Sequence, residues 1–437
     1  MLIIFISTHN EQWKMELINL YQMKKNVCLQ FSKHFFHLVT FLFLLFILSC
    51  TSQPNIPTSN EQFWEGTEGL TFSFVEENPP EEVYEDMLFS IALELQNKGA
   101  HTLSGFLTLS IEDDYLCLVD ENNECSTFNA VDQLSLSVRD EIQNYYIAID
   151  QYTKELTLAT DQETKDALKE KIQTARVNIQ RLQKTSAVAN PYKTKWISLE
   201  GKSIFNYEGG TTVISYPAKA KTAGSLSEKH LVEVVATACY EYTTVWNQEI
   251  CIDTDINKMN TFPGACEATD VSLSGQGAPL AITKIETKML PTGTGYIKPM
   301  FRIYVENSGN GKIINKEKIE HACTATGLSN KDYNMVFLKS FMLSSEQFLY
   351  DFNGYDPATN RELNPGTDGD LISCTPNPLI LKNDGNDYIT CIVADGLEWD
   401  MFSMNQAPYM TTIALQFDYG YTLSKSQQMT IQKILTY

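Results

Sequence analysis

The sequence predicts a mainly β protein of two β-sandwich domains, the first of which carries an inserted antiparallel α-helical hairpin. Three observations lead to this fold class. Apolar and polar residues alternate over 89–99, the pattern recurs 210 residues later, and heptads interrupt the first half between 137 and 186. Alternation with period 2 is typical of strands that bury one face, and heptads are typical of paired helices.

Each half of the chain opens and closes with similar strands. "FSIALELQNKG" (89–99) has apolar side chains at every second position before an Asn-x-Gly turn, and "PMFRIYVENSG" (299–309) repeats this at an offset of 210. Later in each half, "ACYEYTTVWNQEICI" (238–252) aligns without gaps with "FDYGYTLSKSQQMTI" (417–431) at an offset of 179. We therefore expect a duplicated β-domain.

Two heptad seams predict the helical hairpin over 137–186. Their apolar positions are Val138, Ile142, Tyr145, Ile149, Tyr152 and Leu156 in the first helix, and Leu168, Ile172, Ala175, Ile179 and Leu182 in the second. Thr160 with Glu163 forms a capping box that predicts the start of the second helix. The hairpin is either a solvated stalk or the docking element for a partner subunit, with Tyr146 facing outward as a contact.

The stretch 70–111 contains a first strand, a turn at Pro79-Pro80, a long strand ending in Asn-x-Gly, and a strand that opens with Gly105. This order resembles the CARDB-type, immunoglobulin-like modules of prokaryotic surface proteins, and 282–309 follows it more loosely. The resemblance implies two immunoglobulin-like β-sandwiches, over 68–262 and 263–437. It also implies binding, adhesion or spacing rather than catalysis.

Residues 1–50 are predicted to be an export signal. Lys24, Lys25 and Lys33 precede the apolar run 35–48, which is shorter than the roughly 20 residues that a membrane-spanning helix needs. Met23, at the start of "MKKN", is a more natural first residue than Met1.

The end of this signal, "ILSC" (47–50), resembles the lipobox of prokaryotic lipoproteins. The resemblance implies that Cys50 receives a lipid and becomes the mature N-terminus, with 51–67 as a linker. An uncleaved anchor and ordinary cleavage near Ser49 are the alternatives. Each of them places the protein outside the cytoplasm, and lipidation places it on the cell surface.

Eight cysteines follow the signal, and an even number in an oxidising compartment predicts disulfides. They are Cys117, Cys125, Cys239, Cys251, Cys266, Cys323, Cys374 and Cys391. Proximity in sequence suggests the pairs Cys117–Cys125, Cys239–Cys251 and Cys374–Cys391, which leaves Cys266 with Cys323 by elimination.

The charge balance restricts the partners. The formal net charge is −21, and nucleic acid or anionic lipid surfaces require clustered Lys and Arg. No nucleic-acid partner is therefore expected. The expected partners are the membrane, through the lipid or signal anchor, and envelope proteins or surface glycans.

The segment 344–370 is rich in Asn, Asp, Gly and Pro, and long loops at the end of a rigid scaffold often carry binding sites. Its aromatic residues are candidates for binding contacts or for a lid that packs on its own domain: Phe348, Tyr350, Phe352 and Tyr355.

No catalytic residue, cofactor or metal site is predicted. The sequence contains no G-x-S-x-G, P-loop, G-x-G-x-x-G or H-E-x-x-H motif. An EF-hand loop counted from Asp253 fails because Lys258 and Gly264 stand where Gly and Glu are needed; an irregular calcium site stays open. The expected function is that of a non-catalytic exported surface lipoprotein. The alternatives are a subunit of an envelope machine or filament, and a carbohydrate-active enzyme or its accessory module.

Overall fold

Antiparallel sheets dominate the structure, so the predicted mainly β class is confirmed. The computed structural model describes residues 65–120, 122–126, 136–186, 193–204, 206–222, 228–258, 264–323, 328–343, 348–351, 355–356, 361–362, 372–382, 385–393 and 402–434. Strands from both halves of the chain share one large sheet, and two smaller sheets each come from one half.

The first sheet has five strands in the order β1-β3-β8-β5-β6. Their bounds are β1 Leu70–Phe74, β3 Leu88–Asn97, β8 Thr211–Ala220, β5 Leu116–Val119 and β6 Cys125–Ser126. The second sheet has five strands in the order β10-β11-β12-β20-β18. Their bounds are β10 Val271–Ser272, β11 Leu280–Pro291, β12 Ile297–Asn307, β20 Asn386–Val393 and β18 Ile372–Thr375. The period-2 alternation predicted over 89–99 is seen in β3, where Ile91, Leu93 and Leu95 are fully buried.

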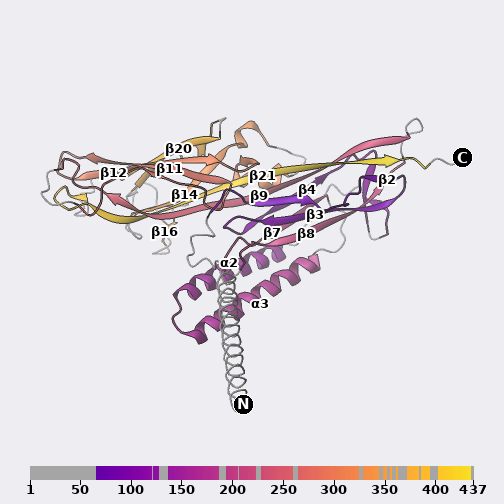
Figure 1. Cartoon of the computed structure of the whole chain (residues 1–437), viewed down its shortest axis with the longest axis horizontal. Helices are drawn as coiled ribbons and strands as arrows, with labels where there is room; N and C mark the ends of the chain where they lie inside the picture. Colours follow the sequence, from indigo (N-terminus) through magenta and orange to yellow (C-terminus); the bar gives the residue numbers. More distant parts are fainter. Residues whose placement is uncertain are drawn as a thin grey trace, which may run out of the picture. The chain divides into compact units, whose positions relative to one another are not determined.

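The nine-stranded sheet follows the path β15-β14-β21-β9-β4-β7, with β13, β19 and β2 attached beside it. Their bounds are β15 Phe348–Asp351, β14 Met335–Leu343, β21 Tyr409–Gln432, β9 Lys229–Ile252, β4 Leu103–Ser110, β7 Thr194–Leu199, β13 Lys312–Ile314, β19 Leu379–Ile380 and β2 Glu82–Tyr84. Strands β16 (Tyr355–Asp356) and β17 (Arg361–Glu362) form a separate pair. The sheet is centred on β9 and β21, which pair along their whole length of 24 residues each (Figure 1).

One continuous apolar core joins the three sheets. On the first sheet, the Tyr216 hydroxyl of β8 donates to the Leu107 carbonyl of β4 at 3.4 Å. On the second sheet, Phe301 of β12 packs on Phe341 of β14 with ring centroids 5.6 Å apart. Each small sheet therefore buries one face against the nine-stranded sheet. Strands β9 and β21 connect both halves of the chain within one sheet. The division into two domains at 262–263 therefore stays a prediction.

Two helices follow one another in the first half. They are α2 (Leu136–Leu158) and α3 (Gln162–Ser186), which lie side by side (Figure 1). The positions of the two predicted seams are buried or partly buried in a cluster that these helices share. Three short helical turns lie in the second half: η2 (Lys316–Lys318), α4 (Ile319–Ala322) and η3 (Asn330–Asp332).

Two details of the predicted helices were wrong. The capping box at Thr160 is displaced by one residue, because α3 begins at Gln162 and the Asp161 carboxylate accepts the Thr164 N–H at 2.8 Å. Tyr146 does not face outward. Its side chain is only 9% exposed, and its hydroxyl donates to the Ser198 carbonyl of β7.

Candidate functional site

The eight predicted cysteines form four disulfides. The pairs are Cys117–Cys125, Cys239–Cys323, Cys251–Cys266 and Cys374–Cys391. The first and last pairs are as predicted. Four disulfides indicate an oxidising, extracytoplasmic environment.

The predicted pairs Cys239–Cys251 and Cys266–Cys323 are wrong. The segment between Cys239 and Cys251 is not a hairpin, because both residues lie on the uninterrupted strand β9. Twelve residues of extended chain span about 40 Å, whereas a disulfide requires Cα atoms within about 7 Å. Each cysteine of β9 is therefore bonded to a different loop segment.

The other predicted site residues are only partly within the described structure. Cys50 and Phe352 lie outside the described residues. The backbones of Phe348 and Tyr350 belong to β15, which pairs with β14, and that of Tyr355 belongs to β16; their side chains are outside the description. Whether these aromatic residues form a binding surface stays a prediction.

A candidate functional surface lies on the side of the nine-stranded sheet that faces away from the main core. We call it the outer face, and its central residues are Phe106 of β4, Cys239 of β9 and Asp418 of β21. Here the disulfide Cys239–Cys323 ties α4 to β9. Phe106, Ile314 and Ile319 form a small apolar cluster around that bond, and the Thr108 hydroxyl donates to the Cys323 carbonyl at 2.7 Å. The described residues 315–323, which follow β13, are thus fastened to the sheet.

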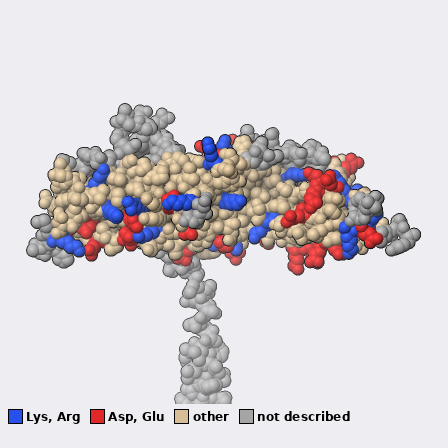
Figure 2. Space-filling view, turned by 90° about the horizontal axis from the view of Figure 1, so that it is seen from above, with Lys and Arg blue, Asp and Glu red and all other residues tan. Residues whose placement is uncertain are grey.

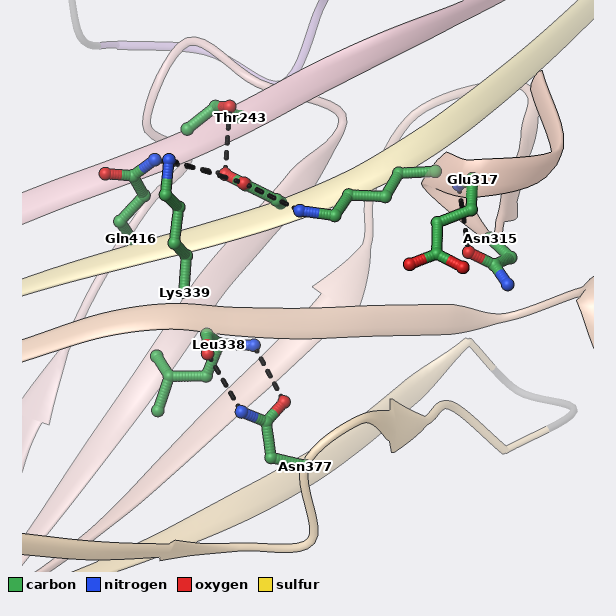
Figure 3. Close-up of polar contacts among 9 residues, drawn as sticks. Thr243, Asn315, Glu317, Leu338, Lys339, Asn377 and Gln416 are labelled. Carbon is green, nitrogen blue, oxygen red and sulfur yellow. Dashed lines mark hydrogen bonds and ion pairs between the residues drawn. The ribbon is translucent and has the colours of Figure 1, made fainter. Parts of the chain in front are cut away.

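A polar network continues the same surface toward β14 (Figure 3). The Asp418 carboxylate accepts hydrogen bonds from the Thr243 hydroxyl and the Gln416 amide, both at 3.1 Å, and from the Lys316 ammonium at 3.2 Å. Lys339 lies 4.0 Å from the same carboxylate. Asp418 is therefore well compensated, and its contact with Lys316 gives the segment 315–323 a second attachment to β21.

The backbone around this network is also held by side chains (Figure 3). The Asn377 amide pairs with both backbone groups of Leu338 at 3.1 and 2.9 Å, next to an irregularity in the pairing of β14 with β21. The Asn315 side chain accepts the Glu317 N–H at 3.0 Å and caps η2. Burial, with a contribution from Asp418, raises the pKa of Glu241 on the neighbouring strand, while Lys316 opposes that shift.

Helices α2 and α3 reach the same surface through β7. Trp196 packs against both the helix cluster and the cluster around Cys239–Cys323. The Arg176 guanidinium of α3 binds the Glu200 carboxylate with two hydrogen bonds, at 3.0 and 2.5 Å, and both side chains are at most 20% exposed. Helices α2 and α3 of the first half and the segment around α4 of the second half therefore lie next to each other on the outer face.

Beneath the outer face, four buried tyrosines occupy the centre of the molecule's core. Tyr240 lies opposite Tyr421, and Tyr242 lies opposite Tyr419, across the β9–β21 pairing. Their ring centroids are 5.7 and 6.2 Å apart within these pairs. Buried tyrosine hydroxyls need hydrogen-bond partners. Here the partners are backbone N–H groups at the first residues of β1 and β11 and in the turns that follow β3 and β12.

The partners of the four hydroxyls recur at the sequence offsets noted above. The Leu70 N–H donates to the Tyr240 hydroxyl at 3.2 Å, and the Leu280 N–H to the Tyr419 hydroxyl at 3.1 Å. Leu70 and Leu280 are 210 residues apart, and the tyrosines are 179 residues apart. In the same way, the His101 N–H donates to the Tyr242 hydroxyl, and the Gly311 N–H donates to the Tyr421 hydroxyl.

The tyrosines are suited to structure rather than to proton transfer. Burial raises the pKa of Tyr421 to about 12 and raises those of the other three further. The hydroxyls therefore stay protonated at neutral pH. Gly99 and Gly309 pass so close that a Cβ atom on either would overlap a tyrosine hydroxyl, of Tyr242 and Tyr421 respectively.

Two histidines of the described ranges have different surroundings. Burial lowers the pKa of His101 to about 4. His230 stacks on Tyr115 with centroids 3.5 Å apart. No group of three or more His, Cys, Asp or Glu side chains in the described part of the chain is placed to hold a metal ion.

The surface charges are interspersed on the face that Figure 2 shows. Lys and Arg lie there in small groups beside Asp and Glu, with uncharged surface between them.

Among the helices of the described residues, none is long and apolar enough to cross a membrane. No protein-family model and no curated protein matches this chain.

Proposed function

We propose that this protein is an exported, non-catalytic surface lipoprotein with a binding, adhesive or structural role in a prokaryotic cell envelope. In this proposal Cys50 carries the lipid, and two immunoglobulin-like sandwiches of the CARDB type cover 68–262 and 263–437. Helices α2 and α3 are an insertion into the first sandwich. The observation that carries the proposal is the set of four disulfides, two of which fasten other segments to β9 of the nine-stranded sheet, while the other two lie within the small sheets.

The disulfides support export, and their positions support a rigid scaffold. Cys239–Cys323 links β9 to the second half of the chain, and Cys251–Cys266 fixes the segment that follows β9. Strands of 24 residues extend for about 80 Å at 3.3 Å per residue. A braced sheet of this length suits a protein that holds binding elements at a fixed distance from a membrane.

The recurring hydrogen bonds support the duplication. Two unrelated domains would have no reason to bind corresponding tyrosine hydroxyls through backbone N–H groups at the same two offsets. A duplicated module, whose last strands pair with each other, accounts for β9 and β21 being equally long and antiparallel. It also accounts for the turns at Asn97 and Asn307, whose amides donate to the carbonyls of His101 and Gly311.

The test is intact and peptide mass spectrometry of the protein from its native membrane, with and without reduction. The expected result is a lipid-modified Cys50 at the mature N-terminus and eight oxidised cysteines. The control is Cys50→Ser, which should lose the lipid and leave the membrane fraction while keeping the four disulfides. An unprocessed N-terminus with free thiols would refute export.

A second candidate is a subunit of an envelope assembly that docks through α2 and α3. Two observations favour it. The helices lie next to the segment around α4 on the outer face, and the Arg176–Glu200 pair fixes the helices on the sheet. Leu158 at the end of α2 is 81% exposed, and Ile147 is 58% exposed.

Substitutions on the helices separate this candidate from the first. Leu158→Glu and Ile147→Glu should abolish cross-links to envelope proteins in intact cells, because both introduce charge at exposed apolar positions. Val213→Glu is the matched control, since Val213 is also 58% exposed but lies on β8. Equal cross-linking by all three variants would exclude docking through the helices.

A further inference from the structure

A pair of tyrosines lies on the solvent side of the second sheet, opposite the main core. Tyr304 of β12 and Tyr388 of β20 are direct cross-strand partners. Their ring centroids are 5.2 Å apart and the rings are tilted by 44°. Tyr388 is 38% exposed. We call this pair, with the neighbouring Arg302, the tyrosine platform.

Paired charges surround the platform. The Lys284 ammonium lies 2.9 Å from Asp270 and 2.8 Å from Glu286, and it stands 5.8 Å from the centre of the Tyr304 ring. The Tyr304 hydroxyl is hydrogen-bonded to Glu286, which also lies 3.8 Å from Arg302. The polar groups around Tyr304 are therefore held in fixed positions by one another.

The Tyr388 side of the platform has the same character. The Arg302 guanidinium lies 5.6 Å from the centre of the Tyr388 ring, and the Lys382 ammonium lies 5.9 Å from it. Lys382 is paired with Asp387 at 3.2 Å. Among the charged groups that contact the two rings or one another, three cations are matched by three carboxylates, so these groups largely neutralise each other.

The fold itself does not require these rings. At the corresponding place in the first sheet, 210 residues before Tyr304, Glu94 of β3 pairs with Val213 of β8. The neighbouring pair there is Ala92 with Ser215, where the second sheet has Arg302 with Thr390. The first and second sheets thus have corresponding strands at this place but different side chains. The aromatic pair is present in the second sheet, and Glu94 with Val213 stands at that position in the first.

We propose that the tyrosine platform binds a neutral saccharide chain that lies across β12 and β20. This deepens the binding role proposed above, and it rests on export, which brings the platform to envelope or surface glycans. The C–H face of a pyranose ring is apolar and slightly positive, so it packs on the electron-rich face of an aromatic ring. Its hydroxyl groups are hydrogen-bond donors and acceptors, which Arg302, Glu286 and Lys284 are placed to match.

The charge balance selects this class of ligand. A cationic ligand, although attracted to aromatic faces, would meet Arg302, Lys284 and Lys382 near the rings. A strongly anionic chain would meet Glu286, Asp270 and Asp387. A neutral chain rich in hydroxyl groups is repelled neither by the cations nor by the carboxylates.

The test is affinity gel electrophoresis of the purified, oxidised full chain in gels that contain a neutral β-glucan, a mannan or a galactan. Dextran sulfate is the anionic probe. We expect at least one neutral polysaccharide to retard the wild-type chain. Tyr388→Ala should weaken the apparent Kd about tenfold, as expected for loss of one stacking ring, and Tyr388→Phe should retain most of the binding.

Tyr84→Ala is the matched control, because Tyr84 is 53% exposed on β2, away from the platform. Urea unfolding of each variant shows that its fold is intact. The proposal is overturned if no neutral polysaccharide retards the wild type, if dextran sulfate alone does so, or if Tyr84→Ala weakens binding as much as Tyr388→Ala. The assay does not need the lipid, so an unmodified Cys50 would refute the surface anchor and leave this result unaffected.

Discussion

The bond between Cys239 and Cys323 should be the largest contributor to stability among the four disulfides. It closes a loop of 84 residues, whereas Cys117–Cys125 closes a loop of 8. The loop-entropy relation gives about 4.5 kcal/mol for the longer loop and about 2.5 kcal/mol for the shorter one. The perturbation is therefore the double variant Cys239→Ala with Cys323→Ala, compared with Cys117→Ala with Cys125→Ala.

The assay is equilibrium unfolding in urea under oxidising conditions, followed by tryptophan fluorescence and circular dichroism. We expect the Cys239–Cys323 variant to lose about 2 kcal/mol more of the unfolding free energy than the Cys117–Cys125 variant. Limited proteolysis should also cleave first within 315–334, because α4 loses its covalent attachment to β9. An equal loss for the two variants would refute the reasoning from loop length, and protection of 315–334 would refute the role of the bond as an anchor.

Three further predictions concern buried or capping groups. The pKa of His101 is about 4 in the folded protein against 6.5 for an ordinary histidine, so the unfolded chain binds more protons between these values. The unfolding free energy should therefore fall by about 3 kcal/mol as the pH drops from 6.5 to 4, and His101→Gln, measured by urea titration at each pH, should remove that component. Gly309→Ala should cost about 2 kcal/mol by overpacking against the Tyr421 hydroxyl, and Tyr421→Phe in the same chain should recover part of the lost thermal stability; no recovery would argue against that overlap. Asp161→Ala should remove the cap of α3, seen as faster hydrogen exchange in the first turn of α3 and unchanged exchange in β9.

Local patterns in the sequence were sufficient to predict some of the regular elements, among them β3, α2 and α3. The alternation in 89–99 reports which side of β3 is buried, and the heptads report which sides of α2 and α3 meet, because both depend only on residues close in sequence. The cap at Asp161 was missed by one residue because Thr160 and Asp161 are both good capping residues, and the local pattern did not settle which one ends the loop.

Long-range arrangement could not be predicted in the same way. Proximity in sequence suggested a bond between Cys239 and Cys251, but both residues lie on one uninterrupted strand. The polar residues Asn247, Gln248 and Glu249 between them continue β9 toward its C-terminal end. The attachment of 315–323 to the outer face depends on Cys323 and Lys316, whose partners Cys239 and Asp418 are about 80 to 100 residues away. No short-range signal records such contacts.

The long pairing of β9 with β21 has a consequence for how the protein would respond to force. If the chain is tethered at its N-terminal side and pulled through a ligand on the second sheet, the load runs along two antiparallel strands and shears them. Backbone hydrogen bonds in such a ladder are perpendicular to the strands, so they resist sliding together rather than opening one after another. The Cys239–Cys323 bond joins β9 covalently to the segment whose Lys316 pairs with Asp418 of β21, which adds a further contact between the two strands. The scaffold would then transmit tension between its tether and its ligand without unfolding first at the junction of its halves.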